Sequence, residues 1–273
     1  LSNTVSTSFQ ALFMTVCSGV KYNEGALRAL TVEAPEGTIL NAREPAPVTA
    51  CTVVTSEVMI EATWMALAQA VPERMYAGWG RWLSPSTMGF NPGTGRHFGD
   101  IHFMAKSGAG ATRGLDGWDH MGTVITAGGL RAPDPELHEL VNPYTILQYE
   151  YWPDSAGPGR WRGGMGTVYR WRVNADGISA VNFGGGSHDE TRPYGLCGGG
   201  RAPTSRVLLR RNGIETPVAI QSFFELGRGD EVEVYETGGG GYGPPGERDR
   251  ARLAEDVSDG LVSVEQASAA YGA

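Results

Sequence analysis

The sequence predicts an α+β protein with a β-rich, sandwich- or barrel-like core, a mixed N-terminal region and short C-terminal helices. Short apolar segments rich in Val, Ile, Tyr and Trp recur between residues 146 and 240, and Gly, Pro or Asn bounds each of them. The best helical spacing of apolar residues occurs near the two ends of the chain. Glycine occupies 40 of 273 positions, about twice the usual ~7%, which indicates a folded chain with many tight backbone positions.

Residues 1–145 are expected to form a mixed α/β and loop-rich region. Apolar residues at helical spacing predict helices over 8–17 and 56–72. Two short strands are expected between these helices, at 30–33 and 49–54. From residue 81 onward, prolines and glycines divide the region into pieces too short for long helices. The second helix is expected to bury the face formed by Met59, Ala62, Met65, Ala66 and Ala70.

Residues 146–247 are expected to form a β-rich domain, and residues 248–273 a helical tail that packs on the rest. Strands are expected at 146–152, 166–173, 178–183, 206–210 and 231–235, at the spacing of a sandwich or barrel. The tail has one helix signal at 248–257. A second follows Ser263, which forms a capping-box pattern with Gln266.

Charge and composition exclude several classes of function. Twenty-two basic and 30 acidic residues give a net charge of −8, whereas a nucleic-acid binder needs clustered basic residues. The apolar runs fall short of the ~20 residues of a membrane helix, so no membrane contact is expected. The three cysteines lie far apart and are odd in number, which argues against a disulfide framework. We therefore expect a cytoplasmic protein.

The candidate catalytic residues are Asp116, Asp119 and His120, which lie in a glycine-bounded segment. A carboxylate beside an imidazole can orient its tautomer and tune a general base. Asx turns and loop hydrogen bonds explain the same residues without chemistry. Asn23 and Glu24 are candidate substrate-binding residues, and a hairpin turn is the alternative for them.

A metal site is not predicted within this chain. His97, Asp100 and His102 have the chemistry of zinc ligands. On a strand, His97 and His102 would point to opposite faces, so that convergence would require a bend. We expect solvated loop side chains there. The phosphate-loop pattern GxxxxGK[ST] is also absent from the sequence, so the glycine-rich segments do not predict a nucleotide site.

Three motifs change the functional interpretation. Residues 149–166 read YEYWPDSAGPGRWRGGMG and resemble the YExRPDSGGxGxxRGGxG signature of the hydantoinase B/5-oxoprolinase family. Residues 192–200 (RPYGLCGGG) resemble the family's RxPxGLxGG segment, and residues 237–243 (TGGGGYG) resemble its TPGGGGYG segment. Matches in the family's order extend over nearly the whole chain. On this resemblance, the motif glycines are expected to be fixed turns of a β-scaffold.

The resemblance covers only the second half of the family's length. The upstream stretches resembling NDPYxGGxHxxD and HxxDxGG have no counterpart here. In related ketone carboxylases, that upstream region holds a catalytic metal. The resemblance therefore implies a split or processed subunit, which a separate N-terminal-half hydantoinase B-like chain completes. A divalent metal is expected in that partner and none in this chain.

The resemblance also implies an ATP-dependent complex. A hydantoinase A-like subunit is expected to use ATP and Mg to phosphorylate a small-molecule substrate. The B-type subunit would then act on that intermediate, as a cyclic amide or imide hydrolase or as a ketone carboxylase. Residues 123–142 lack the family's TNTxxTPxE-like run, which tilts the expectation slightly toward carboxylation. The alternative is a non-catalytic scaffold or assembly subunit of the same kind of complex.

Overall fold

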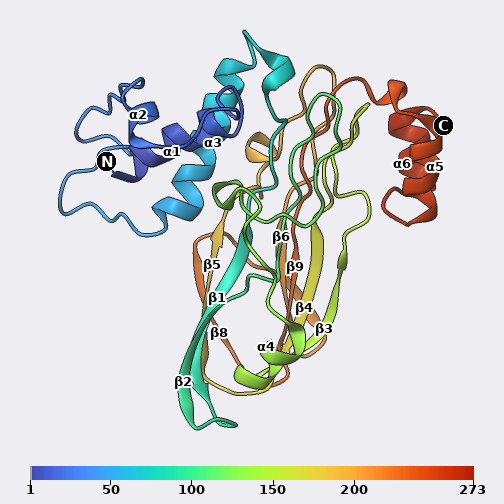
Figure 1. Cartoon of the computed structure of the whole chain (residues 1–273). Helices are drawn as coiled ribbons and strands as arrows, with labels where there is room; N and C mark the ends of the chain where they lie inside the picture. The colour runs from blue at the N-terminus through green and yellow to red at the C-terminus, as the bar shows by residue number, and fades with distance from the viewer. Residues whose placement is uncertain (1) are drawn as a thin grey trace.

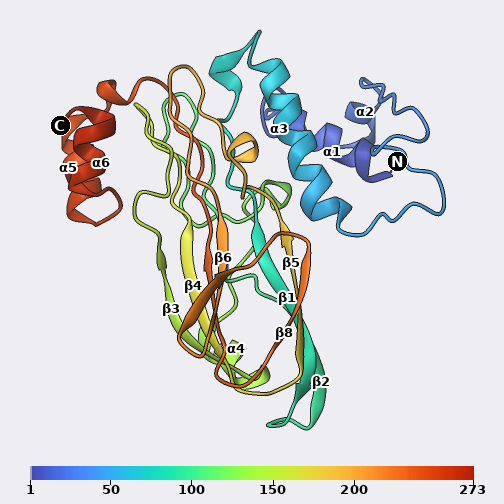
Figure 2. The ribbon, with the colours of Figure 1, turned by 180° about the vertical axis from the view of Figure 1, so that it is seen from behind.

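Two antiparallel sheets face each other in the computed structural model, which describes residues 2–273 (Figure 1, Figure 2). The strands are β1 (Leu83–Asn91), β2 (Arg96–Ile101), β3 (Tyr144–Tyr151), β4 (Thr167–Val173), β5 (Ile178–Gly184), β6 (Arg206–Arg211), β7 (Ile214–Pro217), β8 (Ser222–Leu226) and β9 (Glu231–Tyr235). One sheet has the order β2-β1-β5-β8 and the other the order β3-β4-β9-β6-β7. The α+β class with a sandwich-like core is confirmed.

The core of the sandwich forms because alternate strand residues are large and apolar. Tyr169, Trp171 and Val173 of β4 are buried, and Val232 and Val234 of β9 lie in the same cluster. Each fully buried apolar side chain of this size stabilises the fold by roughly 1.5–3 kcal/mol relative to its exposed state. The strands expected in this part of the chain are confirmed as β3, β4, β5, β6 and β9.

The sandwich also uses residues that were expected to lie in loops. β1 and β2 form a hairpin, and β1 pairs with β5. Pro85 lies in β1 just before the residues that pair with β2, so at this position β1 has a neighbouring strand, β5, on one side only. Because β3 begins at Tyr144, the boundary expected between residues 145 and 146 falls inside a strand. The short strands β7 and β8 were also not expected.

Helices lie at both ends of the chain and beside the sandwich. They are α1 (Ser2–Phe13), α2 (Glu24–Leu27), α3 (Ser56–Leu67), α4 (Pro135–Val141), α5 (Arg250–Ser258) and α6 (Val264–Tyr271), with a π-helical turn at Cys51–Thr55 and 3-10 turns at Pro72–Arg74, Val124–Thr126, Asp189–Thr191 and Pro245–Glu247. The cap predicted at Ser263 is confirmed, since its Oγ accepts a hydrogen bond of 3.0 Å from the Gln266 amide. Across residues 2–273, the helices are too short or too polar to cross a bilayer.

Two expectations for the N-terminal region are wrong. Residues 30–33 have no regular structure, and most of 49–54 is a helical turn that leads into α3. The β-branched residues of 49–54 favoured a strand. The segment is helical because it leads into α3, which packs on α1, where the Trp64 indole donates a hydrogen bond of 2.8 Å to the Ala11 carbonyl.

The prediction of which face of α3 is buried is also wrong, because Ala62 and Met65 are exposed. The buried face consists of Ser56, Glu57, Ile60, Glu61 and Trp64.

Extended, glycine-rich segments pack against one another between the sandwich and the helices (Figure 1). We call residues 77–80, 105–111, 117–122, 155–166, 194–200 and 237–243 the glycine layer. Its segments exchange backbone hydrogen bonds: the Gly164 amide donates to Ala109 at 2.8 Å, and the Gly239 amide donates to Gly164 at 2.9 Å. A Cβ on Gly163 would lie 1.8 Å from the Gly239 carbonyl oxygen. No side chain fits at such a distance.

This packing corrects the interpretation of the motif glycines as turns. Among the glycines of 157–166, 195–200 and 238–243, positive φ angles occur at Gly198 and Gly243. Most of the others have a neighbouring backbone atom less than 3 Å from where a Cβ would stand. Their shared requirement is therefore close approach of backbones, for which glycine is the residue that fits.

Candidate functional site

His120 lines a cavity of about 360 Å³ on the β3 side of the glycine layer. The other lining residues are Tyr149, Glu150, Tyr151 and Thr167, and we call this cavity the His120 pocket. The His120 ring forms a hydrogen bond with the Tyr149 hydroxyl through Nε2. Burial, and then the nearby Lys106 cation, lower the pKa of His120 to about 4. At neutral pH the ring is therefore uncharged.

Asp119, which was expected to orient the imidazole, holds the backbone instead. Its Oδ1 accepts hydrogen bonds of 2.7 Å from the Met165 amide and 2.9 Å from the Arg162 guanidinium. The ring's hydrogen-bond partner is Tyr149. Asp119 thus fixes the segment that carries His120 rather than contacting the ring.

Asp116 belongs to a largely buried ion network that ties the C-terminal helices to the glycine layer. Arg248 binds both of its carboxylate oxygens, at 2.9 and 3.0 Å. Arg162 and Arg248 each donate through Nε to Asp256 of α5 at 2.9 Å. Because both arginines are paired with carboxylates and hydrogen-bonded, these interactions offset the free-energy cost of removing the charges from water. Asp116 also accepts a hydrogen bond of 2.8 Å from the Arg162 amide, so that its carboxylate joins the glycine layer to Arg248.

Asn23 and Glu24 lie at the start of the short helix α2. Asn23 Oδ1 caps the helix by accepting a hydrogen bond of 3.1 Å from the Ala26 amide. Glu24 is exposed and lies 3.7 Å from Arg28. Neither residue lines the His120 pocket.

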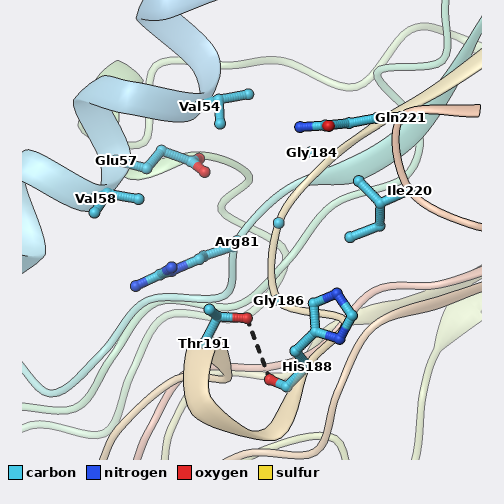
Figure 3. A pocket seen from close by; sticks show the side chains of 11 residues that line it. Val54, Glu57, Val58, Arg81, Gly184, Gly186, His188, Thr191, Ile220 and Gln221 are labelled. Carbon is cyan, nitrogen blue, oxygen red and sulfur yellow. Dashed lines mark hydrogen bonds between the residues drawn. The ribbon is translucent and has the colours of Figure 1, made fainter. Parts of the chain in front are cut away.

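A second cavity, of about 320 Å³, lies between α3 and the loops that follow β5 and precede β8 (Figure 3). Its lining residues are Val54, Glu57, Val58, Arg81, Gly184, Gly185, Gly186, His188, Thr191, Ile220 and Gln221. We call it the Glu57 pocket. Figure 3 shows Glu57 extending from α3 into this space, with the Gln221 amide across from it. Gln221 has a φ of +57°, a left-handed conformation that is rare for a residue with a side chain.

Glu57 is a buried acid with one unpartnered oxygen. The residue is 2% exposed, and its Oε1 lacks a hydrogen-bond partner within residues 2–273. Burial raises the pKa of Glu57 to about 8, although hydrogen bonds from Thr123 and Trp82 act in the opposite direction. The carboxyl group is therefore mostly protonated at neutral pH and can donate a proton to a bound molecule.

Arg81 places a cation in the wall of the same pocket. Its Nε and Nη2 atoms donate to Glu61 Oε2, at 2.9 and 2.5 Å, and the Trp79 amide binds the other carboxylate oxygen at 2.9 Å. The guanidinium thus already has one carboxylate partner, Glu61, and its charge lowers the pKa of Glu57 by less than burial raises it. The pocket combines a proton donor, a fixed cation and a polar amide.

The sequence contains one indication of the Glu57 pocket, a pair of carboxylates on one face of α3, which the expected apolar face of the helix led us to overlook. Glu57 and Glu61 are one turn apart, in phase with Ile60 and Trp64. Carboxylates on the buried stripe of a helix are rarely there for packing alone. Residues on the other wall, such as Gln221, come from loops more than 120 residues away in the sequence, and no local pattern links them to α3.

Residues 1–245 match the model of the Hydantoinase B/oxoprolinase family. The caprolactamase subunit beta of Pseudomonas jessenii is 34% identical over 99% of this chain and 48% of its own length. The crystal structure of the ATP-dependent caprolactamase from Pseudomonas jessenii matches with a TM-score of 0.86 and 32% identity, over 98% of this chain and 47% of that one.

A nucleotide-free acetone carboxylase structure shares the fold, with a TM-score of 0.64 and 24% identity over 76% of this chain and 31% of that one. The chain thus spans about half the length of the caprolactamase subunit. The profile match and the 34% identity agree with the three motifs recognised in the sequence. The chain belongs to the Hydantoinase B/oxoprolinase family.

Proposed function

We propose that this chain forms the C-terminal half of a hydantoinase B-type subunit in an ATP-dependent complex that opens cyclic amides. The observation that carries the proposal is the similarity to the caprolactamase beta subunit, which extends over 99% of the chain at 34% identity. The fold agrees with that of the solved caprolactamase over 98% of the chain. We therefore favour amide hydrolysis over the carboxylation that residues 123–142 suggested.

The Glu57 pocket is the best place in this chain for a reacting group. Opening a cyclic amide requires a proton on the departing nitrogen, and a carboxyl group with a pKa of about 8 carries one at neutral pH. Arg81, in the same wall, would balance the negative charge of a phosphorylated intermediate. A cavity of about 320 Å³ suits a small ring.

His120 is the second candidate for a reacting group. Its uncharged ring and the Tyr149 hydroxyl could orient a substrate carbonyl in the His120 pocket. In this proposal, Asp116 and Asp119 act as positioning residues. Asn23 and Glu24 remain proposed substrate-binding residues at the surface.

The proposal includes a hydantoinase A-like partner subunit, which supplies ATP and Mg. The N-terminal half of the hydantoinase B-type subunit would hold a divalent metal and pack against this chain's fold. Support comes from the N-terminal region, where large apolar side chains are exposed at Val20, Tyr22, Ile39, Val48, Val58 and Met65. A surface of this kind is typical of an interface. A cytoplasmic location is part of the proposal, because the complex would need ATP.

The test co-expresses this chain with its genomic neighbours and measures ADP release that depends on a lactam, an oxoproline-type ring or a hydantoin. Replacing Glu57 with Gln keeps the shape of the side chain but removes its acidic proton. We expect turnover to fall about 10²-fold or more if Glu57 is the proton donor. Glu255→Gln, an exposed change on α5, is the matched control.

His120→Gln distinguishes the two pockets. A larger loss of turnover in this variant than in Glu57→Gln would move the chemistry to the His120 pocket. Full turnover in both variants, in a complex that still requires this chain for assembly, would show the scaffold role instead. An intact complex that hydrolyses none of these rings would refute the cyclic-amide function.

A further inference from the structure

A cluster of two imidazoles and one carboxylate lies away from both pockets, at the end of the sandwich that α4 covers (Figure 1). Asp100 is the next-to-last residue of β2, His102 follows that strand, and His138 is in α4. Side chains alternate along β2, so Asp100 lies on the same face as Phe98, which packs on the core. His102, expected to be solvated, is fully buried, whereas His97 is exposed on the opposite face.

The spacing of the three donor atoms fits a bound cation. Asp100 Oδ2 lies 3.5 Å from His102 Nε2 and 3.3 Å from His138 Nε2, and all three atoms lie within 4.8 Å of one another. With metal–ligand bonds of about 2.0–2.1 Å, two ligands of a tetrahedral ion are about 3.4 Å apart. Both carboxylate–imidazole distances agree with that value.

The cluster also contains polar atoms that the protein leaves unpartnered. Asp100 Oδ2 and His138 Nε2 are buried and, within residues 2–273, have no hydrogen-bond partner, although they are only 3.3 Å apart. His138 is 5% exposed and is the buried residue of α4. A buried donor or acceptor without a partner destabilises a fold by about 1–3 kcal/mol. A bound cation would satisfy both atoms.

The surroundings hold the His102 ring in the orientation of a ligand. Its Nδ1 is 3.2 Å from the Tyr169 hydroxyl, and the ring stacks on Trp171 with centroids 4.1 Å apart. A hydrogen bond at one ring nitrogen commonly fixes the other as the metal ligand.

We propose that Asp100, His102 and His138 bind a divalent cation of the zinc class and thereby fasten α4 to the end of β2. Two imidazoles and one carboxylate are a donor set typical of Zn²⁺ and neighbouring first-row ions. The Thr87 hydroxyl, 3.1 Å from His102 Nε2, supplies a further polar atom beside the cluster. The three residues line neither pocket.

The test measures zinc in the purified chain after EDTA treatment, reloading with one equivalent of Zn²⁺ and desalting. We expect one Zn²⁺ per chain in the wild type and an affinity at least tenfold lower in His138→Gln. His97→Gln, on the exposed face of β2, is the matched control and should retain the ion. Asp100→Asn, with the same shape as Asp, serves as a second variant if His138→Gln does not fold.

Thermal unfolding supplies a second measurement. Zn²⁺ should raise the Tm of the EDTA-treated wild type and of His97→Gln but leave that of Asp100→Asn unchanged. If Zn²⁺ does not raise the Tm of the wild type and the wild type retains no stoichiometric zinc, the proposal is overturned. In that case His102 Nε2 has the Thr87 hydroxyl as its hydrogen-bond partner and binds no metal. Equal zinc content in the wild type and both ligand variants would also overturn it.

Discussion

Replacing Glu57 with Gln should stabilise the protein at alkaline pH, which is the opposite of what loss of an ordinary carboxylate does. The side chain is buried on α3, and its Oε1 lacks a partner in the part of the chain that the structure describes. Burial raises the pKa of Glu57 from its ordinary 4.5 to about 8. Gln has the same shape and carries no charge at any pH.

The magnitude follows from proton linkage. Between pH 4.5 and pH 8 the folded state keeps a proton on Glu57 that the unfolded chain has lost, so its contribution to stability falls as pH rises. The free energy of unfolding then decreases by about 1.4 kcal/mol per pH unit. From pH 5 to pH 8 the total is on the order of 3–4 kcal/mol. The contribution is fully present below pH 4.5 and lost above pH 8.

Other buried acids titrate in the same direction but are common to both proteins. Burial also raises the pKa values of Glu61 and Glu236. Both residues are retained in Glu57→Gln, but their charges interact with that of Glu57, so the difference between variant and wild type reports Glu57 together with its effect on these two acids. The exposed change Glu255→Gln shows how much any lost carboxylate shifts the curve.

The assay is thermal unfolding of the wild type and both variants at pH 5, 6, 7 and 8. The Tm advantage of Glu57→Gln should grow from near zero at pH 5 to roughly 10 °C at pH 8, at about 2–4 °C per kcal/mol. A difference independent of pH, or a wild type more stable than the variant at pH 8, would refute the argument that Glu57 is a buried, protonated acid.

Two further changes test the packing. Gly163→Ala would place a Cβ 1.8 Å from a carbonyl oxygen of the glycine layer, and overpacking of this kind destabilises a fold by about 1–3 kcal/mol or more. The control Gly246→Ala, where the new Cβ would stand in open space, should leave the urea midpoint of unfolding unchanged. Equal midpoints for the two variants would contradict the close-approach explanation. Asp256→Ala leaves two buried arginines without their shared carboxylate, so the free energy of unfolding should fall by about 3–5 kcal/mol. The control Glu255→Ala, in the same helix, should change the free energy of unfolding by less than about 0.5 kcal/mol.

Elements whose determining residues all lie within a short stretch of sequence could be predicted. β9 was predicted with the bounds it has, because alternating apolar residues and flanking turns are all within a short window. The cap at Ser263 depends only on residues three positions apart. The strand expected at 49–54 failed because its β-branched residues have no neighbouring strand to pair with, and packing of α3 on α1 decides the outcome.

The candidate sites could be predicted only in part, because each is assembled from distant segments. His120 was identified, but its partner Tyr149 is 29 residues further along the chain. Asp100 and His102 were noted as possible ligands, yet the third member, His138, comes from a helix beyond a long loop. Glu57 was missed because the apolar pattern predicted burial of the opposite face of α3.

The most direct test of the proposed function is the identity of the product that forms only when this chain is present. Reconstituted subunits are incubated with ATP and a lactam, with and without bicarbonate, and the products are identified by mass spectrometry. The proposal predicts one ring-opened amino acid per ring consumed, together with ADP, no requirement for bicarbonate, and loss of the product when this chain is omitted. A product that requires bicarbonate and a ketone substrate would contradict it.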